Sequence, residues 1–485
     1  MSGRGQAPST SIDARSGPIA DREKSTMNSV EHSRKSVSAF LRGFWNRMAT
    51  SSVFQRLAGG VAWSVFGTGC SKVLTLVAFI LVARSLGEKA YGEFGFVRQT
   101  ALMFLSFSAA GVGAAATKYI AELLPTDGKR VGRIIGLSYL FTFCTAIVMS
   151  GVLYVGAPWL CETWLKKPQI VTEMRIGAVL LFIQTMMATQ VGVISGFQDF
   201  RGLAVASFIS GLFVIPGCVM GARFGGSPGA LLGLVVCGGL NFAVQSAVIF
   251  RSTKKHRLRY DFSGAFRETG ILWRYNLPTL LGNLVFAAAY WYCQTILIVS
   301  SSSTADVAIA YAALDIHVMI QYFPVLAGSV FLPLLSQHSA VASTYRKIVR
   351  LYFTATLAFT LLSILPVIWF SRGILSLYGS SFVEGSATLV MICLFLLPHL
   401  LNNVFKVIFQ SRGDQWRTFF YLIVFAWVAV CVCQILVGMN WGSFGLAVGL
   451  FAGATAQLAV QMCYWVTTPS RKVLSSTPVP TVNHV

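Results

Sequence analysis

The uncharged run GALLGLVVCGGLNFAVQSAVIF at residues 229–250 is followed directly by RSTKKHRLRYDFSGAFRETGILWR at residues 251–274, which holds 7 lysines and arginines. The first run is long enough to cross a hydrocarbon core of about 30 Å as one α-helix. The second run carries charges that are costly inside hydrocarbon, so it belongs at a membrane surface. Together the two runs predict a membrane-spanning helix that ends in a basic surface loop.

The same alternation of apolar runs and polar loops recurs along the 485 residues of the chain. Lipid offers the backbone no hydrogen-bond partner, so a spanning segment must be an α-helix or a strand of a closed barrel. Runs of about 20 continuously apolar residues match helices, because barrel strands are shorter and alternate in polarity. We therefore predict an all-α, polytopic membrane protein. The twelve predicted transmembrane helices lie at residues 58–82, 94–117, 134–156, 174–194, 203–222, 229–250, 275–299, 307–333, 350–370, 386–410, 418–438 and 443–466.

The distribution of charge predicts how these helices are oriented. If both termini are cytoplasmic, the cytoplasmic segments hold 28 of the 38 lysines and arginines, whereas the outside loops hold 6. This excess in alternate short loops is the positive-inside pattern, and it places loops 118–133 and 251–274 in the cytoplasm. The net charge of +21 then reflects topology and contact with anionic lipid headgroups. A nucleic-acid partner is not expected, because it needs a contiguous basic surface on a soluble domain.

The basic loop divides the helices into two sets of six, and such paired halves are a common transporter arrangement with the substrate path between them. The first residues are rich in Ser and charge, which predicts a disordered leader, and residues 37–57 have the composition of an amphipathic helix on the inner leaflet. The predicted divisions are a cytoplasmic leader at 1–57, a six-helix bundle at 58–250, a cytoplasmic linker at 251–274, a second six-helix bundle at 275–466 and a cytoplasmic tail at 467–485.

Lys72 is the strongest candidate for a functional residue, because an ionisable side chain inside a membrane is costly. It lies in the middle of its apolar segment, and Ser64, Thr68 and Thr75 share its helix face at spacings of four, four and three residues. A polar face of this kind should point to the protein interior. Lys72 therefore either lines a cavity or pairs structurally with another helix.

Three other basic residues lie in apolar stretches. Arg98 is about one turn inside its helix, from which it can reach outward to the surface or point into a cavity. Arg175 is nearer its helix end, and we expect it to reach the surface. His399, Asn403 and Lys406 form a second polar face at spacings of four and three residues. Lys406 is near the inner helix end, so it is either a headgroup anchor or a ligand contact.

Asp315 is the one acid well inside an apolar segment. It can neutralise Lys72 or Arg98, or it can carry a coupling ion. His317 points to a different face of the same helix, and we expect it to be a packed, neutral side chain. Because four embedded bases outnumber one acid, the core is predicted to be cationic and to attract an anionic substrate. The spacing of Cys and His predicts neither a metal site nor another cofactor.

Four short motifs then carry a family resemblance. ARSLGEKAYGEFG at residues 83–95 resembles the ARxLGxxxYGxF pattern between the first two helices of polysaccharide flippases of the O-antigen translocase (Wzx) type. ATKYIAE at 116–122, GFQDFR at 196–201 and QSRG at 410–413 are also typical of these flippases. The resemblance covers about residues 58–466, and the order of the motifs along the chain is its most specific part.

The resemblance implies membership of the MOP superfamily, which also contains cation-coupled multidrug exporters and peptidoglycan-precursor flippases. It implies two six-helix bundles around a central cavity, in a multi-pass protein of the bacterial inner membrane. Drug exporters of this superfamily often have an Asp in the first helix, where this chain has Lys72. Peptidoglycan-precursor flippases have Arg on the first, second and eighth helices. Lys72 and Arg98 can take the first two places, but Asp315 departs at the third, which argues against lipid II.

The implied substrate is an oligosaccharide on undecaprenyl pyrophosphate, moved from the cytoplasmic to the outer leaflet, with polysaccharide polymerase and export proteins as further partners. Two alternatives stay open. One is a cation-coupled exporter of drugs or other small molecules. The other is a membrane polysaccharide polymerase or transferase, which usually needs a sizeable external loop with catalytic groups. The longest outside loop, 157–173, offers only Glu162 and Glu173 as acids, so we expect a transporter rather than an enzyme.

Overall fold

The computed structural model describes residues 52–108, 111–258, 269–300, 304–337 and 342–467. Residues 60–485 form one compact unit, and the features below belong to it. The described part of the chain contains helices and turns but no strand. The prediction of an all-α protein is therefore confirmed. Of the predicted leader and tail, residues 1–51 and 468–485 lie outside the described residues, and residues 52–57 belong to a helix.

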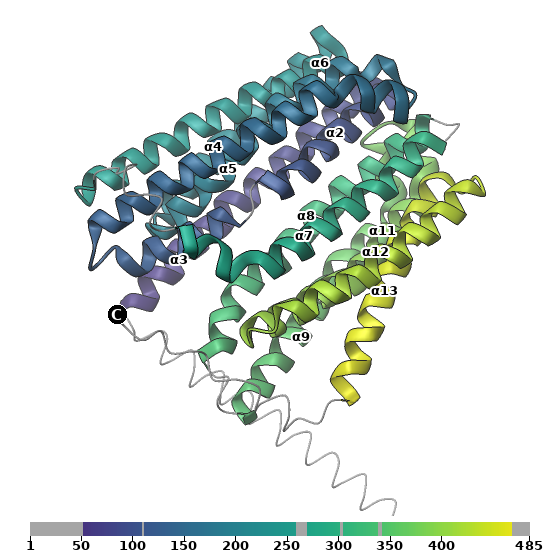
Figure 1. Ribbon diagram of the computed structural model, residues 1–485. Coiled ribbons are helices and arrows are strands. Elements are labelled where there is room, and N and C mark those ends of the chain that lie inside the picture. The colour runs from purple at the N-terminus through teal and green to yellow at the C-terminus, as the bar shows by residue number, and fades with distance from the viewer. Residues whose placement is uncertain (1–51, 109–110, 259–268, 301–303, 338–341, 468–485) are drawn as a thin grey trace, which may run out of the picture. The chain divides into compact units, whose positions relative to one another are not determined.

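The first part of the chain forms five long helices with two short ones between α4 and α5 (Figure 1). They are α2 at Ser52–Ser108, α3 at Val112–Leu123, α4 at Gly128–Pro158, η1 at Trp159–Trp164, η2 at Pro168–Ile170, α5 at Val171–Gly196 and α6 at Phe200–Lys255.

The second part follows the same pattern, again with short helices at one connection. It comprises α7 at Thr269–Ser300, α8 at Thr304–Gln337, α9 at Ala342–Trp369, α10 at Ser371–Ser376, η4 at Ser380–Gly385, α11 at Ser386–Ser411, α12 at Gln415–Gly438 and α13 at Gly442–Thr467.

Ten helical stretches among the described residues are long and apolar enough to cross a membrane. Two of the ten have more than ordinary length, Gly67–Ser108 with 42 residues and Phe200–Lys255 with 56. Each contains a glycine with non-helical torsion angles, Gly87 at φ 72° and Gly226 at φ 59°, where two helices join. Positive φ is readily adopted by glycine, which has no Cβ. The fold is therefore compatible with the twelve predicted crossings.

The prediction of a single helix at residues 94–117 is wrong. The apolar run at 94–117 is divided, because α2 ends at Ser108 and α3 begins at Val112. Gly111 has the left-handed φ of 73°, which ends the regular helix before α3. Gly113 of α3 then lies against α5, because a Cβ on Gly192 would overlap with the Gly113 backbone and a Cβ on Gly113 would lie 2.8 Å from the Ala188 carbonyl oxygen.

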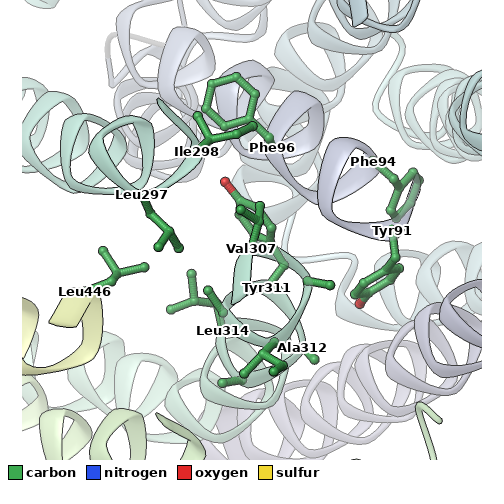
Figure 2. Packing of buried hydrophobic residues seen from close by; sticks show 14 of the residues in the cluster. Tyr91, Phe94, Phe96, Leu297, Ile298, Val307, Tyr311, Ala312, Leu314 and Leu446 are labelled. Carbon is green, nitrogen blue, oxygen red and sulfur yellow. The ribbon is translucent and has the colours of Figure 1, made fainter. Parts of the chain in front are cut away.

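Helices α3 to α6 pack on one another, and helices α7, α8, α9, α11, α12 and α13 pack on one another. Helix α2 joins the two sets, because its buried residues Tyr91, Phe94 and Phe96 belong to the same apolar cluster as Leu297 of α7 and Tyr311 of α8 (Figure 2). This shared core positions α2 against α8.

Several large apolar side chains are exposed, as a chain that faces lipid requires. Val155, Phe224 and Trp369 expose 78%, 86% and 84% of their surface. Such side chains are costly in water when they are numerous and contiguous. Together with the apolar helices, they describe a multi-pass membrane protein.

Candidate functional site

A cavity of about 860 Å³ lies among the helices of the compact unit. Its volume is near the upper end of the range for ligand pockets, roughly 300–1,000 Å³. It is lined from both sets of helices, with Lys72 on α2, Gln184 on α5 and Asn283 on α7 among its residues. The six site residues nominated from sequence all line it: Lys72, Arg98, Asp315, His399, Asn403 and Lys406.

Lys72 reaches this cavity from the middle of α2. It makes no hydrogen bond or ion pair with any residue in the described ranges, so a structural ion pair does not hold it there. Thr75, on the same face of α2, also lines the cavity and donates its hydroxyl to the Ser71 carbonyl at 2.8 Å. Lys72 is thus an available cation on the cavity surface.

Lys406 lines the cavity from α11, and its ammonium group donates to Asn283 Oδ1 at 3.1 Å. Since an amide oxygen is uncharged, this hydrogen bond leaves the positive charge of Lys406 uncompensated. The two lysines therefore bring one cation from each set of helices to the same cavity. Arg175, by contrast, is exposed outside the cavity lining, with its guanidinium 5.3 Å from the centre of the Tyr154 ring.

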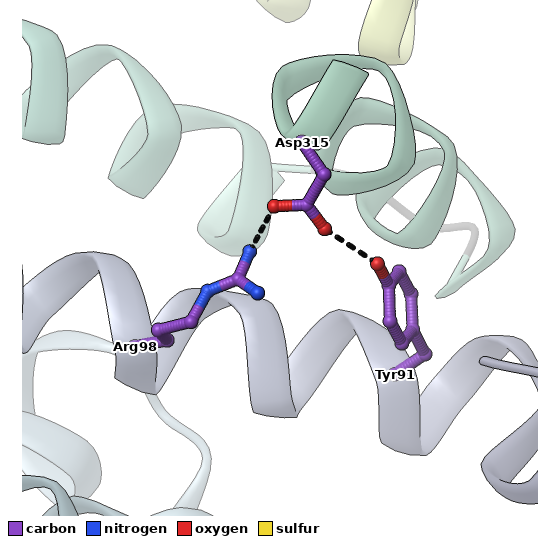
Figure 3. A network of polar contacts seen from close by, with 3 residues as sticks. All are labelled: Tyr91, Arg98 and Asp315. Atoms are coloured by element: carbon purple, nitrogen blue, oxygen red, sulfur yellow. Dashed lines mark hydrogen bonds and ion pairs between the residues drawn. The ribbon is translucent and has the colours of Figure 1, made fainter. Parts of the chain in front are cut away.

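Arg98 also reaches the cavity, but it is already paired. Its Nη2 forms an ion pair with Asp315 Oδ1, and Tyr91 donates its hydroxyl to Asp315 Oδ2 at 2.6 Å (Figure 3). The guanidinium also lies 4.0 Å from the centre of the Phe79 ring. The sequence left Lys72 and Arg98 open as partners of Asp315, and the structure pairs it with Arg98. Arg98 is therefore mainly neutralised, although its Nη1 has no partner among the described residues.

Two glycines of the ARSLGEKAYGEFG motif allow this pairing, because they bring α2 close to α8. A Cβ on Gly92 would lie 3.2 Å from Val307 Cγ1, and a Cβ on Gly95 would overlap with the ring of Tyr311. Small residues at helix contacts permit this kind of close backbone approach in membranes. The side chains of Tyr91 and Arg98, on the same stretch of α2, can then reach Asp315.

Other residues of the motif contact the short helices that follow α9. Arg84 donates from Nε to the carbonyl oxygen of Leu377. The Tyr91 ring lies 6.1 Å from the ring of Tyr378 and 6.0 Å from that of Phe382. The motif is therefore a packing and hydrogen-bonding element between α2 and the second set of helices. We define the residues Tyr91, Gly92, Gly95, Arg98 and Asp315 as the α2–α8 contact.

The rest of the cavity wall is largely uncharged but polar. It includes Gln99, Gln184, Asn283, Asn402, Thr418 and Gln457. His317 is packed, as expected from sequence, because it is 4% exposed, and it also borders the cavity. Its ring stacks on Phe395 at 5.2 Å, but both of its nitrogens lack a partner among the described residues.

Sequence reasoning missed several of these residues for identifiable reasons. Tyr91 was part of the family motif, but nothing in the motif showed its hydrogen-bond partner, 224 residues away. Gln184 is an isolated polar residue in an apolar run, whereas Asn283 shares a polar face with Asn276 and Thr279, at spacings of three and four residues, that could have marked it. No group of three or more possible metal ligands occurs in the part of the chain that the structure describes.

Paired sets of membrane helices around one polar cavity define a class of multi-pass membrane proteins, and this arrangement is common among transporters. Residues 57–339, more than half of the chain, match the polysaccharide biosynthesis protein family. This chain belongs to that family.

Two relatives are polysaccharide export proteins. The EPS I polysaccharide export inner membrane protein EpsE of Ralstonia nicotianae is 23% identical over 401 residues, which cover 79% of this chain and 89% of that protein. The protein of the same name from Ralstonia solanacearum is 23% identical over 407 residues, with the same coverage.

Solved structures show where the fold belongs. An inward-facing multidrug resistance MATE family transporter of the MOP superfamily matches with a TM-score of 0.67 and 16% identity, over 84% of this chain and 95% of that one. The lipid II flippase MurJ, in an inward closed conformation, matches with a TM-score of 0.66 and 14% identity, over 85% of this chain and 89% of that one. The predicted MOP-type fold is therefore confirmed, and the protein is a multi-pass membrane protein of the polysaccharide biosynthesis family.

Proposed function

We propose that this protein is a flippase that moves an oligosaccharide linked to undecaprenyl pyrophosphate from the cytoplasmic to the outer leaflet of the bacterial inner membrane. The observation that carries the proposal is the cavity of about 860 Å³, which presents two uncompensated lysines and many uncharged polar side chains. Membership of the polysaccharide biosynthesis family and the export role named for EpsE support it.

The physical task of such a protein is to replace headgroup water. A pyrophosphate with attached sugars cannot cross hydrocarbon unaided, because leaving water costs many kcal/mol for a charged group. A polar, cationic cavity offers the headgroup substitute contacts while the prenyl chain stays in lipid. The cavity lies in the helices that cross the membrane, as this task requires.

Each nominated residue then has a distinct role. Lys72 and Lys406 attract the pyrophosphate, since an ammonium group makes strong, charge-assisted hydrogen bonds to phosphate oxygens. His399 and Asn403 contact the glycan. Arg98 and Asp315 hold α2 against α8.

The same charges weigh against the alternatives. A carrier of cationic drugs needs exposed carboxylates in its cavity, whereas the one carboxylate in this cavity lining is paired with Arg98. A polymerase or transferase needs several accessible catalytic groups in its loops. Of the two acids at 157–173, Glu173 is buried at 7% exposure and Glu162 is exposed. The charge pattern of the loops places both termini in the cytoplasm, where we expect polysaccharide polymerase and export proteins to act in the same pathway.

Export of the surface glycan by single variants tests the proposal. Lys72→Ala should lower surface glycan by about tenfold or more at normal protein level, because a lost charged hydrogen bond costs roughly 1.5–3 kcal/mol. Lys72→Arg should keep part of the activity because the charge remains. The matched control is Arg175→Ala, which removes a base outside the cavity and should export normally. Full export by Lys72→Ala would overturn the cationic-cavity mechanism.

A further inference from the structure

Of the two lysines that line the cavity, Lys406 has a side chain that is hydrogen-bonded to a neighbouring helix. Its ammonium group on α11 donates to Asn283 Oδ1 on α7 at 3.1 Å, and both residues line the cavity. Asn283 is among the exposed residues of this lining. The hydrogen bond therefore lies at the cavity surface, between two helices of the second set.

The backbones that carry this pair are fixed by packing. One residue before Asn283, a Cβ on Gly282 would lie 2.9 Å from Leu422 Cδ1, so α7 approaches α12 closely at this point. The residues on either side of Lys406 are buried in an apolar cluster with residues of α9. The place of the Lys406 charge thus depends mainly on the conformation of its own side chain.

The hydrogen bond to Asn283 restricts that conformation. A lysine has a flexible four-carbon stem, so an unrestrained ammonium group samples many positions. Ordering such a side chain when a ligand binds costs conformational entropy, and ordering it beforehand lowers this cost. An ammonium group has three N–H donors, of which Asn283 accepts one. Lys406 is therefore held in place and still has donors for phosphate oxygens.

The acceptor that holds Lys406 is uncharged. An amide oxygen accepts a hydrogen bond without a formal charge, whereas a carboxylate at the same place would form an ion pair and neutralise the ammonium group. The one acid among the described residues that line the cavity, Asp315, is already paired with Arg98. Asn283 thus restricts Lys406 and leaves its charge available to an anion.

We propose that Asn283 is a positioning residue, which holds the Lys406 ammonium group at the cavity surface for the pyrophosphate. This inference rests on the proposed function and adds a residue that acts on the substrate through Lys406. A purely structural link between α7 and α11 is a different role, because a carboxylate at position 283 would serve it equally well.

Binding of undecaprenyl pyrophosphate to the purified full-length protein tests the proposal, with undecaprenol as the uncharged reference lipid. The wild type should bind the pyrophosphate about tenfold or more tightly than undecaprenol, because its phosphates accept charge-assisted hydrogen bonds. Asn283→Leu keeps the side-chain volume but removes the acceptor. It should weaken pyrophosphate binding by about fivefold, the size of one net hydrogen bond, and leave undecaprenol binding unchanged.

A double-mutant cycle with Lys406 separates positioning from direct contact. Lys406→Met removes the ammonium group and keeps an apolar chain. In this background Asn283→Leu should cause no further loss of affinity, because its effect depends on Lys406.

An added carboxylate separates positioning from a structural link. Asn283→Asp retains an acceptor of nearly the same shape, so thermal stability should not fall. Its affinity for the pyrophosphate should fall by about tenfold or more, because the carboxylate neutralises Lys406.

Asn241→Leu is the matched control for losing a hydrogen bond. Asn241 Oδ1 also accepts a side-chain hydrogen bond at 3.1 Å, from Gln245 Nε2, but neither residue lines the cavity. This variant should bind the pyrophosphate as tightly as the wild type.

Wild-type affinity of Asn283→Leu or Asn283→Asp for the pyrophosphate would overturn the positioning role. Equal losses from Asn283→Leu with and without Lys406 would also overturn it, because Asn283 would then contact the ligand itself. Failure of the proposed function gives a different result, in which the wild type binds the pyrophosphate no more tightly than undecaprenol, or Lys406→Met binds it normally. Either of these results would overturn the function and this inference together.

Discussion

The polar groups of the α2–α8 contact have hydrogen-bond and ion-pair partners, whereas a charged group of the cavity wall has none among the described residues. In the contact, Asp315 is held by an ion pair with Arg98 and a hydrogen bond from Tyr91, and glycines bring the helices together. In the wall, Lys72 lines the cavity and has no hydrogen-bond or ion-pair partner within the described residues. A matched buried group stabilises one arrangement of helices, whereas an unmatched group on a cavity is available to a ligand.

The difference separates two kinds of functional residue in a transporter. Residues of the contact should affect stability, because they join α2 to α8 through a buried ion pair and close packing. Residues of the wall should affect binding with little effect on folding. Each prediction below tests one side of this comparison.

The largest expected effect is an all-or-none difference in labelling. From the charge pattern we predict that the α6–α7 loop is cytoplasmic and that the segment before the α2–α8 contact is outside. In a cysteine-free background, a cysteine at Lys89 should react with an impermeant reagent in intact cells. A cysteine at Lys255, which is also exposed, should react only after the membrane is opened. Labelling of the Lys255 position in intact cells would reverse the orientation.

Removing the carboxylate of the contact should have the next largest effect. Asp315→Ala leaves Arg98 buried and unpaired, which should lower the free energy of unfolding by about 3–5 kcal/mol. Unfolding in mixed micelles by increasing denaturing detergent measures it. A loss below about 1 kcal/mol, as for a surface ion pair, would show that the pair does not hold α2 to α8.

A double variant separates charge from packing. Arg98→Met with Asp315→Leu removes both charges and keeps apolar volume, so it should regain most of the stability that Asp315→Ala loses. Its glycan export should stay low, because α2 no longer presents a guanidinium to the cavity. Normal export by the double variant would show that Arg98 and Asp315 are not needed for function.

A substitution at the close approach of α2 and α8 should have a smaller effect on stability. Gly95→Ala adds a methyl group that would overlap with the ring of Tyr311, and overpacking of this kind costs about 1–3 kcal/mol. Gly151→Ala in α4 is the matched control, because nothing lies within 4 Å of its added Cβ. The control should be more stable than the wild type by roughly 0.5–1 kcal/mol. Equal effects of the two changes would show that α2 and α8 do not pack at Gly95.

The helices could be predicted from sequence because the length and apolarity of a spanning helix are set by the bilayer. The inward face of Lys72 also followed from spacing alone, since residues three and four apart share a helix face. The division at Gly111 could not be predicted this way, because the run on both sides of it is equally apolar.

The partner of Asp315 was beyond sequence reasoning for a different reason. Arg98 is 217 residues away, and the pairing depends on how closely α2 and α8 pack at Gly92 and Gly95. The uncharged part of the cavity wall could not be predicted from the sequence either. Residues such as Asn283 gain a role only when the opposing helices are in place.

Translocation in reconstituted vesicles tests the central claim most directly, that the two lysines of the cavity carry the headgroup across the membrane. Vesicles would contain undecaprenyl pyrophosphoryl glucose in both leaflets, and a soluble glycan-oxidising reagent would report the fraction exposed outside. Wild type and Arg175→Ala should expose nearly all of the lipid, whereas Lys72→Ala combined with Lys406→Ala should leave the inner-leaflet fraction protected. Full exposure by the double lysine variant, at equal reconstituted protein, would contradict the mechanism.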